Sequence, residues 1–262
     1  MPILGPNILK YYDGVIRDPL HRAYWGQREF YNVGLWSAST TNQMAACVNL
    51  LDRLLSASDS PRAVLDVGCG LGATTHSARQ RWPDAAIHGV NLSATQIDHC
   101  RKHVADCDFH VMDAARLGFA DDSFDFIFSV EAAFHFNTRC DFFREAFRVL
   151  RPGGTIALSD IIVADGQYAR WIYLWDVQAV NAIADVVAYK EVLESVGFVS
   201  IEVEDVTSRS WMAWCDAVER WLECQAENDV VTRKRKNDWQ ASLPLLRTAV
   251  QHYLTAFATK PA

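Results

Sequence analysis

The stretch from Ala63 to Thr74 constrains the fold of this chain most strongly. It reads Ala-Val-Leu-Asp-Val-Gly-Cys-Gly-Leu-Gly-Ala-Thr, so an apolar run is followed by glycines at alternate positions. The apolar run 63–67 is typical of a buried parallel strand, and 73–82 has the pattern of a helix that Pro83 ends. A strand, a glycine turn and a helix in this order let the backbone approach a ligand closely and aim a helix N-terminus at it.

Beyond this stretch, expected strands and helices alternate, which predicts an α/β fold with a parallel sheet covered by helices on both faces. We expect parallel strands at 63–67, 86–90, 107–111, 124–130, 155–159 and 199–206, and an antiparallel last strand at 252–259. Helices are predicted at 73–82, 94–104, 137–150, 188–195, 211–227 and 230–250. Within this pattern Ser93 is a natural helix N-cap, Pro152-Gly-Gly154 is a break, and Gly197 ends a helix.

The first 60 residues precede the glycine motif and are rich in aromatic side chains. They include a helix near 44–55, whose apolar residues recur at helical spacing. We therefore predict two parts, a helical lid at 1–60 and a ligand-binding catalytic domain at 61–262. The second part contains inserts at 161–187 and 207–250, which we expect either to complete a substrate pocket or to form a homo-oligomer contact.

Composition narrows the function classes. The 262 residues are 50% hydrophobic and carry a net charge of -7, which argues against nucleic acid as the main partner. Seven cysteines without a Cys-x-x-Cys pair favour reduced thiols. No apolar run reaches the ~18 residues of a membrane span, and we see no signal-peptide pattern. We therefore expect a cytoplasmic protein with no membrane partner, and no residue spacing suggests a metal site.

The ligand of an open parallel sheet lies beyond the carboxyl ends of its strands. That rule gathers Asp66, Gly68 and Gly70 after the first strand and Asn91 after the second. The third strand ends at Asp113 and Ala114, and the fourth is followed by Glu131 and His135.

A dinucleotide site is one alternative, because Gly68-x-Gly70-x-x-Ala73 formally fits the dinucleotide fingerprint. Two features argue against it. The second strand ends at Asn91 rather than at the acidic residue that binds an adenosine ribose. The first strand also begins only after a long aromatic segment.

A family match is more specific. Val64-Leu-Asp-Val-Gly-Cys-Gly-Leu-Gly72 resembles motif I of the class I S-adenosylmethionine (SAM) methyltransferases. The resemblance continues in order through four more motifs, Gly89-Val-Asn-Leu-Ser93, Met112-Asp-Ala114, Asp122-Ser-Phe-Asp-Phe-Ile-Phe128 and Leu150-Arg-Pro-Gly-Gly154. It implies a Rossmann-like, seven-stranded, mostly parallel sheet of order 3-2-1-4-5-7-6, with strand 7 antiparallel.

The resemblance also implies cofactor contacts. Asp66 and the turn at Gly68 and Gly70 would meet the ammonium and carboxylate of SAM. Its ribose would lie against Asn91, Leu92 and Gln96, where the family usually has an acidic residue in place of Asn91. Asp113 would accept the adenine amino group beside the Ala114 amide, and Glu131 completes the predicted cofactor contacts. S-adenosylhomocysteine (SAH) would be the product.

The segment Glu131-Ala-Ala-Phe-His-Phe136, with Tyr31-Asn-Val-Gly-Leu-Trp36, resembles the branch of the family that methylates natural products, including antibiotics. We predict O-methylation of a small, largely apolar acceptor, with His135 as base and Glu131 as a second catalytic residue. The predicted acceptor contacts are Tyr11, Tyr12, Trp25 and Phe134. Carbon methylation of a prenyl alkene, N-methylation and a SAM-binding module without catalysis remain the alternatives.

Overall fold

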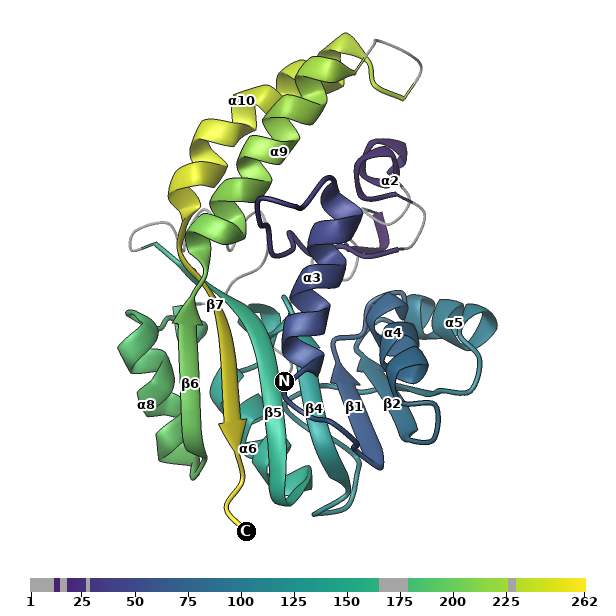
Figure 1. The fold of residues 1–262 in the computed structure, drawn as a ribbon, viewed down its shortest axis with the longest axis vertical. Helices are drawn as coiled ribbons and strands as arrows, with labels where there is room; N and C mark the ends of the chain where they lie inside the picture. The colour runs from purple at the N-terminus through teal and green to yellow at the C-terminus, as the bar shows by residue number, and fades with distance from the viewer. Residues whose placement is uncertain (1–11, 15–17, 27–28, 165–178, 226–229) are drawn as a thin grey trace.

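The computed structural model describes residues 12–14, 18–26, 29–164, 179–225 and 230–262. In these residues one seven-stranded sheet has the order β3-β2-β1-β4-β5-β7-β6 (Figure 1). Strand β7 is antiparallel to β5 and β6, and the other neighbouring strands are parallel. The predicted fold class, strand order and antiparallel strand are thereby confirmed. The strands are β1 (Ala63–Val67), β2 (Ala86–Asn91), β3 (Asp108–Val111), β4 (Phe124–Val130), β5 (Leu150–Val163), β6 (Val199–Asp205) and β7 (Val250–Thr259).

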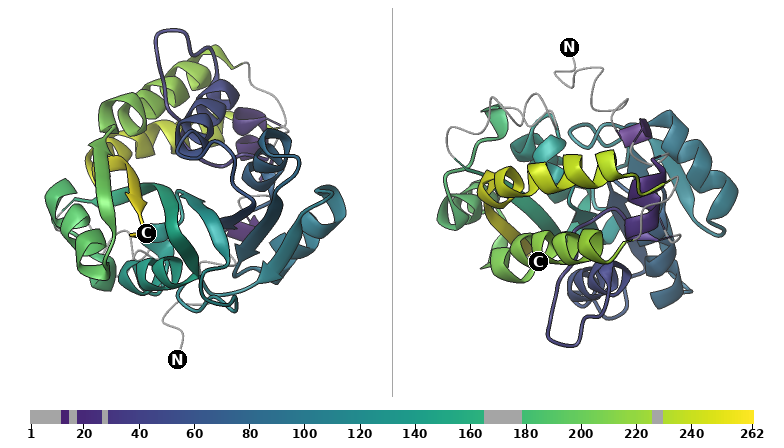
Figure 2. Two further views of the ribbon diagram at one scale, coloured as in Figure 1. Left: turned by 60° about the horizontal axis from the view of Figure 1, so that its bottom comes forward. Right: turned by 90° about the horizontal axis from the view of Figure 1, so that it is seen from above.

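Helices cover both faces of the sheet (Figures 1 and 2). On one face α3 (Gln43–Leu55) and α4 (Ala73–Arg81) share a buried core with Phe126 and Phe128 of β4. On the other face α6 (Arg139–Val149) and α8 (Val186–Val196) pack with Leu65 and Ile127. Neighbouring strand residues thus enter opposite cores, which explains why apolar residues stand at consecutive positions of β1 and β4, interrupted only by Asp66, Asp125 and Ser129.

Local signals set several helix ends as predicted. The Ser93 hydroxyl accepts the Gln96 amide and caps α5 (Ala94–His103). Helix α8 ends at Gly197, whose φ of 112° lies in the left-handed region that glycine adopts without strain. Helix α4 ends at Arg81, two residues before Pro83.

Strand β5 differs from the prediction, which placed it at 155–159 after a break at Pro152-Gly-Gly154. It spans Leu150–Val163. The glycine turn does end the preceding helix, but its backbone still pairs, because Gly153 N–H donates to the Lys260 carbonyl and Gly154 accepts from the Lys260 amide. At the other end, antiparallel pairing with β7 continues to Val163. The first three residues of the predicted insert at 161–187 therefore belong to the sheet, and its residues 165–178 lie outside the described part.

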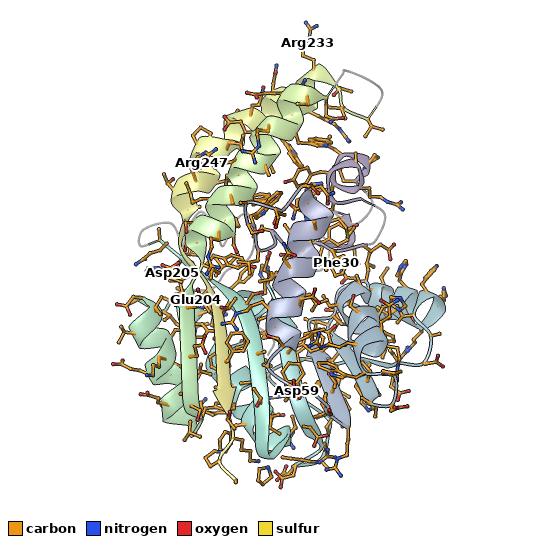
Figure 3. All side chains as sticks on the ribbon, viewed as in Figure 1. Phe30, Asp59, Glu204, Asp205, Arg233 and Arg247 are labelled. Carbon is orange, nitrogen blue, oxygen red and sulfur yellow. The ribbon has the colours of Figure 1, made fainter. Side chains whose placement is uncertain are left out.

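A helical hairpin lies beyond the carboxyl ends of the parallel strands. The described residues that precede α3, called the N-terminal segment below, lie at the same end of the sheet. Helices α9 (Trp211–Cys224) and α10 (Arg233–Ala249) form the hairpin, and α2 (Pro19–Trp25) lies next to it (Figure 1). Arg247 on α10 joins the two hairpin helices through Asp216 at 2.6 Å and Glu219 at 2.9 Å (Figure 3). The described residues also form three short 3-10 turns, η1 (Ala133–His135), η2 (Ala179–Asn181) and η3 (Thr207–Arg209).

Candidate active site

One cavity of about 510 Å³ lies where the strand ends, the N-terminal segment and the hairpin meet. This volume is in the usual range for a small-molecule site. One part of its wall is formed by the strand ends, including Gly68, Gly70, Asn91, Leu92, Gln96, Asp113, Ala114 and Glu131. The other part is mainly aromatic and apolar, including Tyr12, Trp25, Tyr31, Phe134, Trp211, Trp214, Val218, Trp239, Leu243 and Leu246. The cavity therefore brings together most of the site residues predicted from the sequence.

The glycine turn has the shape that a close-lying ligand requires. Gly68 has a φ of 81°, and a Cβ there would come within 2.5 Å of the Ala132 Cβ. Gly70 has a φ of 54° and lines the cavity, and a Cβ there would meet no atom within 4 Å. The turn thus needs glycine for its conformation, and at Gly70 it leaves open space where the backbone can contact a ligand.

Asp66 lies beside the glycine turn, and its predicted contact with the cofactor stays a prediction. Its side chain is buried and does not line the cavity. Its Oδ2 accepts the hydroxyl of Thr74 at 2.6 Å and that of Thr75 at 2.7 Å. Burial raises the pKa of Asp66 to about 6, and the two hydroxyl bonds limit the rise. Because both hydroxyls belong to the first turn of α4, Asp66 fixes the glycine turn against that helix.

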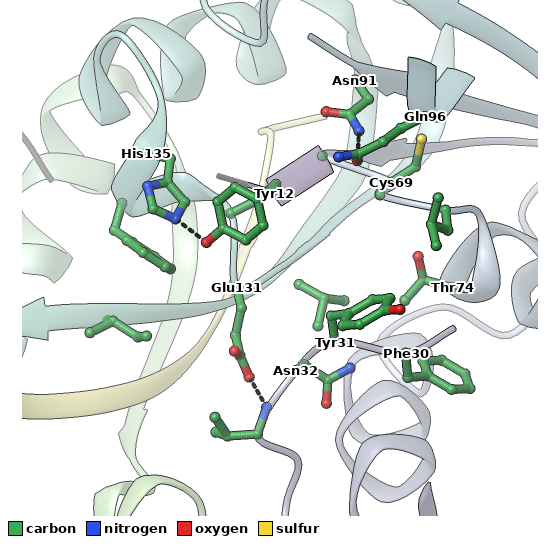
Figure 4. Close-up of a pocket in the computed structure, with 18 of the residues that line it drawn as sticks. Tyr12, Phe30, Tyr31, Asn32, Cys69, Thr74, Asn91, Gln96, Glu131 and His135 are labelled. Carbon is green, nitrogen blue, oxygen red and sulfur yellow. Dashed lines mark hydrogen bonds between the residues drawn. The ribbon is translucent and has the colours of Figure 1, made fainter. Parts of the chain in front are cut away.

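Polar side chains follow the ends of β2 and β3. Asn91 Nδ2 donates to Gln96 Oε1 at 2.6 Å, and Asn91 Oδ1 accepts the Leu92 amide at 2.8 Å (Figure 4). Asn91 and Gln96 both line the cavity, and their pairing holds the two side-chain amides together there. Asp113 also lines the cavity, and its Oδ1 accepts the amide of Ala115 at 2.9 Å.

Glu131 is held at the end of β4 in a left-handed conformation, with a φ of 50°. Its Oε1 accepts the Val33 amide at 2.7 Å and the Tyr253 hydroxyl at 2.6 Å. Burial raises the pKa of Glu131 to about 7, while these two hydrogen bonds limit the rise. A strained, buried carboxyl that faces a cavity is typical of a functional position.

His135 lies on the η1 turn that follows Glu131, and it is buried at the cavity wall. Its Nε2 is 2.6 Å from the hydroxyl of Tyr12, a residue 123 positions earlier in the sequence (Figure 4). The ring of Phe134 lies 4.0 Å from the His135 ring, centre to centre. Of the predicted acceptor contacts, Tyr12, Trp25 and Phe134 line the cavity, and Tyr11 lies outside the described residues.

The sequence analysis did not single out the residues of the hairpin that complete the aromatic wall. Trp214 lies 6.2 Å and Trp239 6.4 Å from the Trp25 ring, measured between ring centres. Trp25 is itself fixed by a hydrogen bond from its Nε1 to the Asn32 carbonyl. The one available signal was the high tryptophan count, nine in the chain, together with the predicted insert at 207–250.

The described cavity wall contains acidic side chains but neither lysine nor arginine. Among the described residues that form it, Glu29, Asp113 and Glu131 carry carboxyl groups, and there is no lysine or arginine. The described residues also contain no group of three or more His, Cys, Asp or Glu side chains placed to hold a metal ion. No helix in the described segments is long and apolar enough to cross a membrane.

Comparison with known proteins gives a consistent result. A family model described as a methyltransferase domain matches residues 65–158. The chain is 30% identical over 216 residues to the 27-O-demethylrifamycin SV methyltransferase of Amycolatopsis mediterranei, covering 75% of this chain and 76% of that protein. It is also 30% identical to the erythromycin 3''-O-methyltransferase of Saccharopolyspora erythraea, covering 78% and 73%.

A solved structure shows the same fold at lower sequence identity. The geranyl diphosphate C-methyltransferase of Streptomyces coelicolor A3(2), solved with SAH, matches with a TM-score of 0.67 and 16% identity, covering 99% of this chain and 98% of that one. With the sheet order and the glycine turn, these matches place the chain in the class I Rossmann-like enzymes. It belongs to the SAM-dependent methyltransferases, and its cofactor is SAM.

Proposed function

We propose that the enzyme methylates a hydroxyl group of a neutral, largely apolar natural product, with His135 as the general base. The observation that carries this proposal is the 2.6 Å contact between His135 Nε2 and a hydroxyl group, that of Tyr12, at the cavity wall. Nε2 is therefore placed so that a hydroxyl can reach it at the distance needed for proton transfer. The two O-methyltransferases that resemble the chain over three quarters of its length support the same acceptor chemistry.

The cofactor contacts that we propose follow the cavity wall. The backbone at Gly68 and Gly70 would hold the methionyl part of SAM, and Asn91, Leu92 and Gln96 would face the ribose. Asp113 and Ala114 would bind the adenine, and Glu131 would lie near the positively charged end of the cofactor. When bound, SAM supplies an electrophilic methyl group, and its sulfur leaves as the neutral thioether of SAH.

The acceptor hydroxyl would take the place of the Tyr12 hydroxyl at His135 Nε2, and His135 would accept its proton as the oxygen forms its bond to the methyl carbon. A neutral imidazole is suited to this step near pH 7. The aromatic wall would exclude water and hold the acceptor in line with the carbon–sulfur bond, so positioning contributes much of the rate.

The aromatic wall also supports a second candidate, carbon methylation of an alkene, because aromatic faces stabilise a developing carbocation. Trp25, Trp214 and Trp239 would provide those faces. Attack by an alkene needs no base, so the two reactions differ in their demand on His135.

The test is transfer of a deuterated methyl group from labelled SAM to a panel of macrocyclic alcohols, amines and prenylated compounds, with the product site located by NMR. We expect an O-methyl product and a fall in kcat of about 10²- to 10⁴-fold in His135→Gln, with SAH affinity unchanged. His76→Gln, on the exposed side of α4, is the matched control. A carbon-methylated product, or near-normal turnover by His135→Gln, would contradict the proposed reaction.

A further inference from the structure

An acidic side chain from the N-terminal segment lies at the expected ribose end of the cavity. Asp13 Oδ1 accepts the hydroxyl of Ser93 at 3.0 Å and the side-chain amide of Gln96 at 3.3 Å. These partners are 80 and 83 positions away in sequence and belong to the start of α5. Asp13 is not among the residues that line the cavity, so it can act on a ligand only through the residues that it holds.

The contact with Asp13 fixes the orientation of two amide groups. Gln96 Nε2 donates to Asp13, which leaves Gln96 Oε1 to accept from Asn91 Nδ2. Asn91 Oδ1 in turn accepts the backbone amide of Leu92. Hydrogen bonds of this kind, in a chain that ends on a carboxylate, are stronger than those between neutral groups. Asp13 therefore supplies the negative charge that is missing from the end of β2, where Asn91 stands.

The neighbouring residue reaches the other end of the site. Tyr12 contacts His135 and Asp13 contacts the start of α5, and the described residues 12–14 are helical, so neighbouring side chains reach both the expected ribose end and the proposed base. Any movement of this turn changes both contacts together. Residues 12 and 13 thereby join the expected ribose end of the cavity to His135.

We propose that Asp13 is a positioning residue that couples cofactor binding to the placement of Tyr12 beside His135. This proposal rests on the proposed function for the role of His135, but the coupling between Asp13 and the cofactor does not depend on which atom is methylated. A ribose bound by Asn91 and Gln96 stabilises the orientation that Gln96 needs to hold Asp13. Cofactor binding then fixes the 12–14 turn over the cavity before the acceptor enters.

The test is a double-mutant cycle on SAH affinity, measured by isothermal titration calorimetry without any acceptor. We expect Asp13→Ala and Gln96→Ala each to raise the Kd for SAH about tenfold, the loss expected for one hydrogen bond to a charged group. The double variant should lie within about threefold of either single variant, because both changes break the same chain of contacts. Asp98→Asn, on the exposed side of α5, is the control.

Hydrogen exchange gives a readout that loss of stability alone would not produce. In the unaltered enzyme SAH should slow exchange in the peptide that carries Tyr12, and in Gln96→Ala saturating SAH should not. An unchanged Kd in Asp13→Ala, or effects of Asp13→Ala and Gln96→Ala that simply add, would overturn the proposal. Neither measurement involves methyl transfer. If the proposed O-methylation proves wrong, the SAH affinities and the hydrogen exchange therefore still test the role of Asp13.

Discussion

Glu131 combines three properties that are unfavourable for an ordinary surface carboxyl. It has a positive φ, it is largely buried, and its Oε1 is shared by the Val33 amide and the Tyr253 hydroxyl. These contacts bind the end of β4 to the segment before α3 and to β7. The residue thus joins the sheet to the N-terminal segment at the cavity, and its protonation state must affect the stability of that junction.

Stability should therefore depend on the Glu131 charge between about pH 4.5 and pH 7. The native pKa of about 7 lies above the usual pKa of 4.5 for a glutamate, so the folded protein keeps a proton that the unfolded chain releases in this window. The free energy of unfolding must then fall as pH rises through it, by up to about 3 kcal/mol from this group. Glu131→Gln keeps an acceptor for both hydrogen bonds and removes the charge.

We expect Glu131→Gln to gain stability relative to the unaltered enzyme as pH rises from 5 to 8, measured by chemical denaturation at each pH. The side-chain amide should show its largest relative benefit at pH 8, where the native carboxylate is ionised. A stability difference that is constant with pH would show that the carboxyl is not perturbed by burial.

At the scale of elements, the sequence predicted what local patterns determine. The glycine turn, the Ser93 cap and the Gly197 helix end follow from residues close together in the chain, and the family motifs implied the sheet order. The length of β5 could not be predicted, because pairing of Leu150 with Phe124 of β4 carries the strand across the glycine break, and pairing with β7 carries it on to Val163. The contact of Tyr12 with His135 joins residues 123 positions apart, so no local pattern indicates it.

The η1 turn that carries His135 is held by one buried side chain, Asn181, which local patterns also do not reveal. Asn181 of η2 donates to the Phe134 carbonyl at 3.2 Å and the Phe136 carbonyl at 2.7 Å, and its Oδ1 accepts the amide of Arg139. The Arg139 side chain is buried and pairs with Asp160 at 2.7 Å. Asn181 is therefore the link between a buried ion pair and the turn of the proposed base.

Asn181→Ala should loosen this turn. Removing three hydrogen bonds and leaving buried carbonyls without a donor should cost about 2 kcal/mol, or a fall in Tm of about 4 to 8 °C. Calorimetry gives the Tm, and kcat should fall more than SAH affinity because the turn holds His135. Asn181→Asp keeps the acceptor for Arg139 and tests the two donor bonds separately. A Tm unchanged in both variants would remove Asn181 from this role.

At the scale of the whole molecule, charge bears on which acceptors can enter. The chain has a net charge of -7, and the described cavity wall has carboxyl groups without lysine or arginine. This distribution favours the positively charged sulfonium of SAM and raises the cost of bringing in a phosphate group. The solved geranyl diphosphate C-methyltransferase shares the fold, but fold similarity does not carry over its substrate.

We therefore predict that the cavity binds an alcohol better than the corresponding diphosphate. Geraniol and geranyl diphosphate form a matched pair, and their binding can be followed by tryptophan fluorescence in the presence of SAH, since Trp214 and Trp239 line the cavity. The diphosphate should bind at least about tenfold more weakly, because its charges face carboxyl groups in a described wall that has no lysine or arginine. Glu29→Gln should narrow the difference by removing one of those carboxylates, and raising the salt concentration should narrow it further through screening. Equal or tighter binding of the diphosphate would show that cationic groups beyond the described wall residues reach the cavity, and a phosphorylated acceptor would then replace the neutral one.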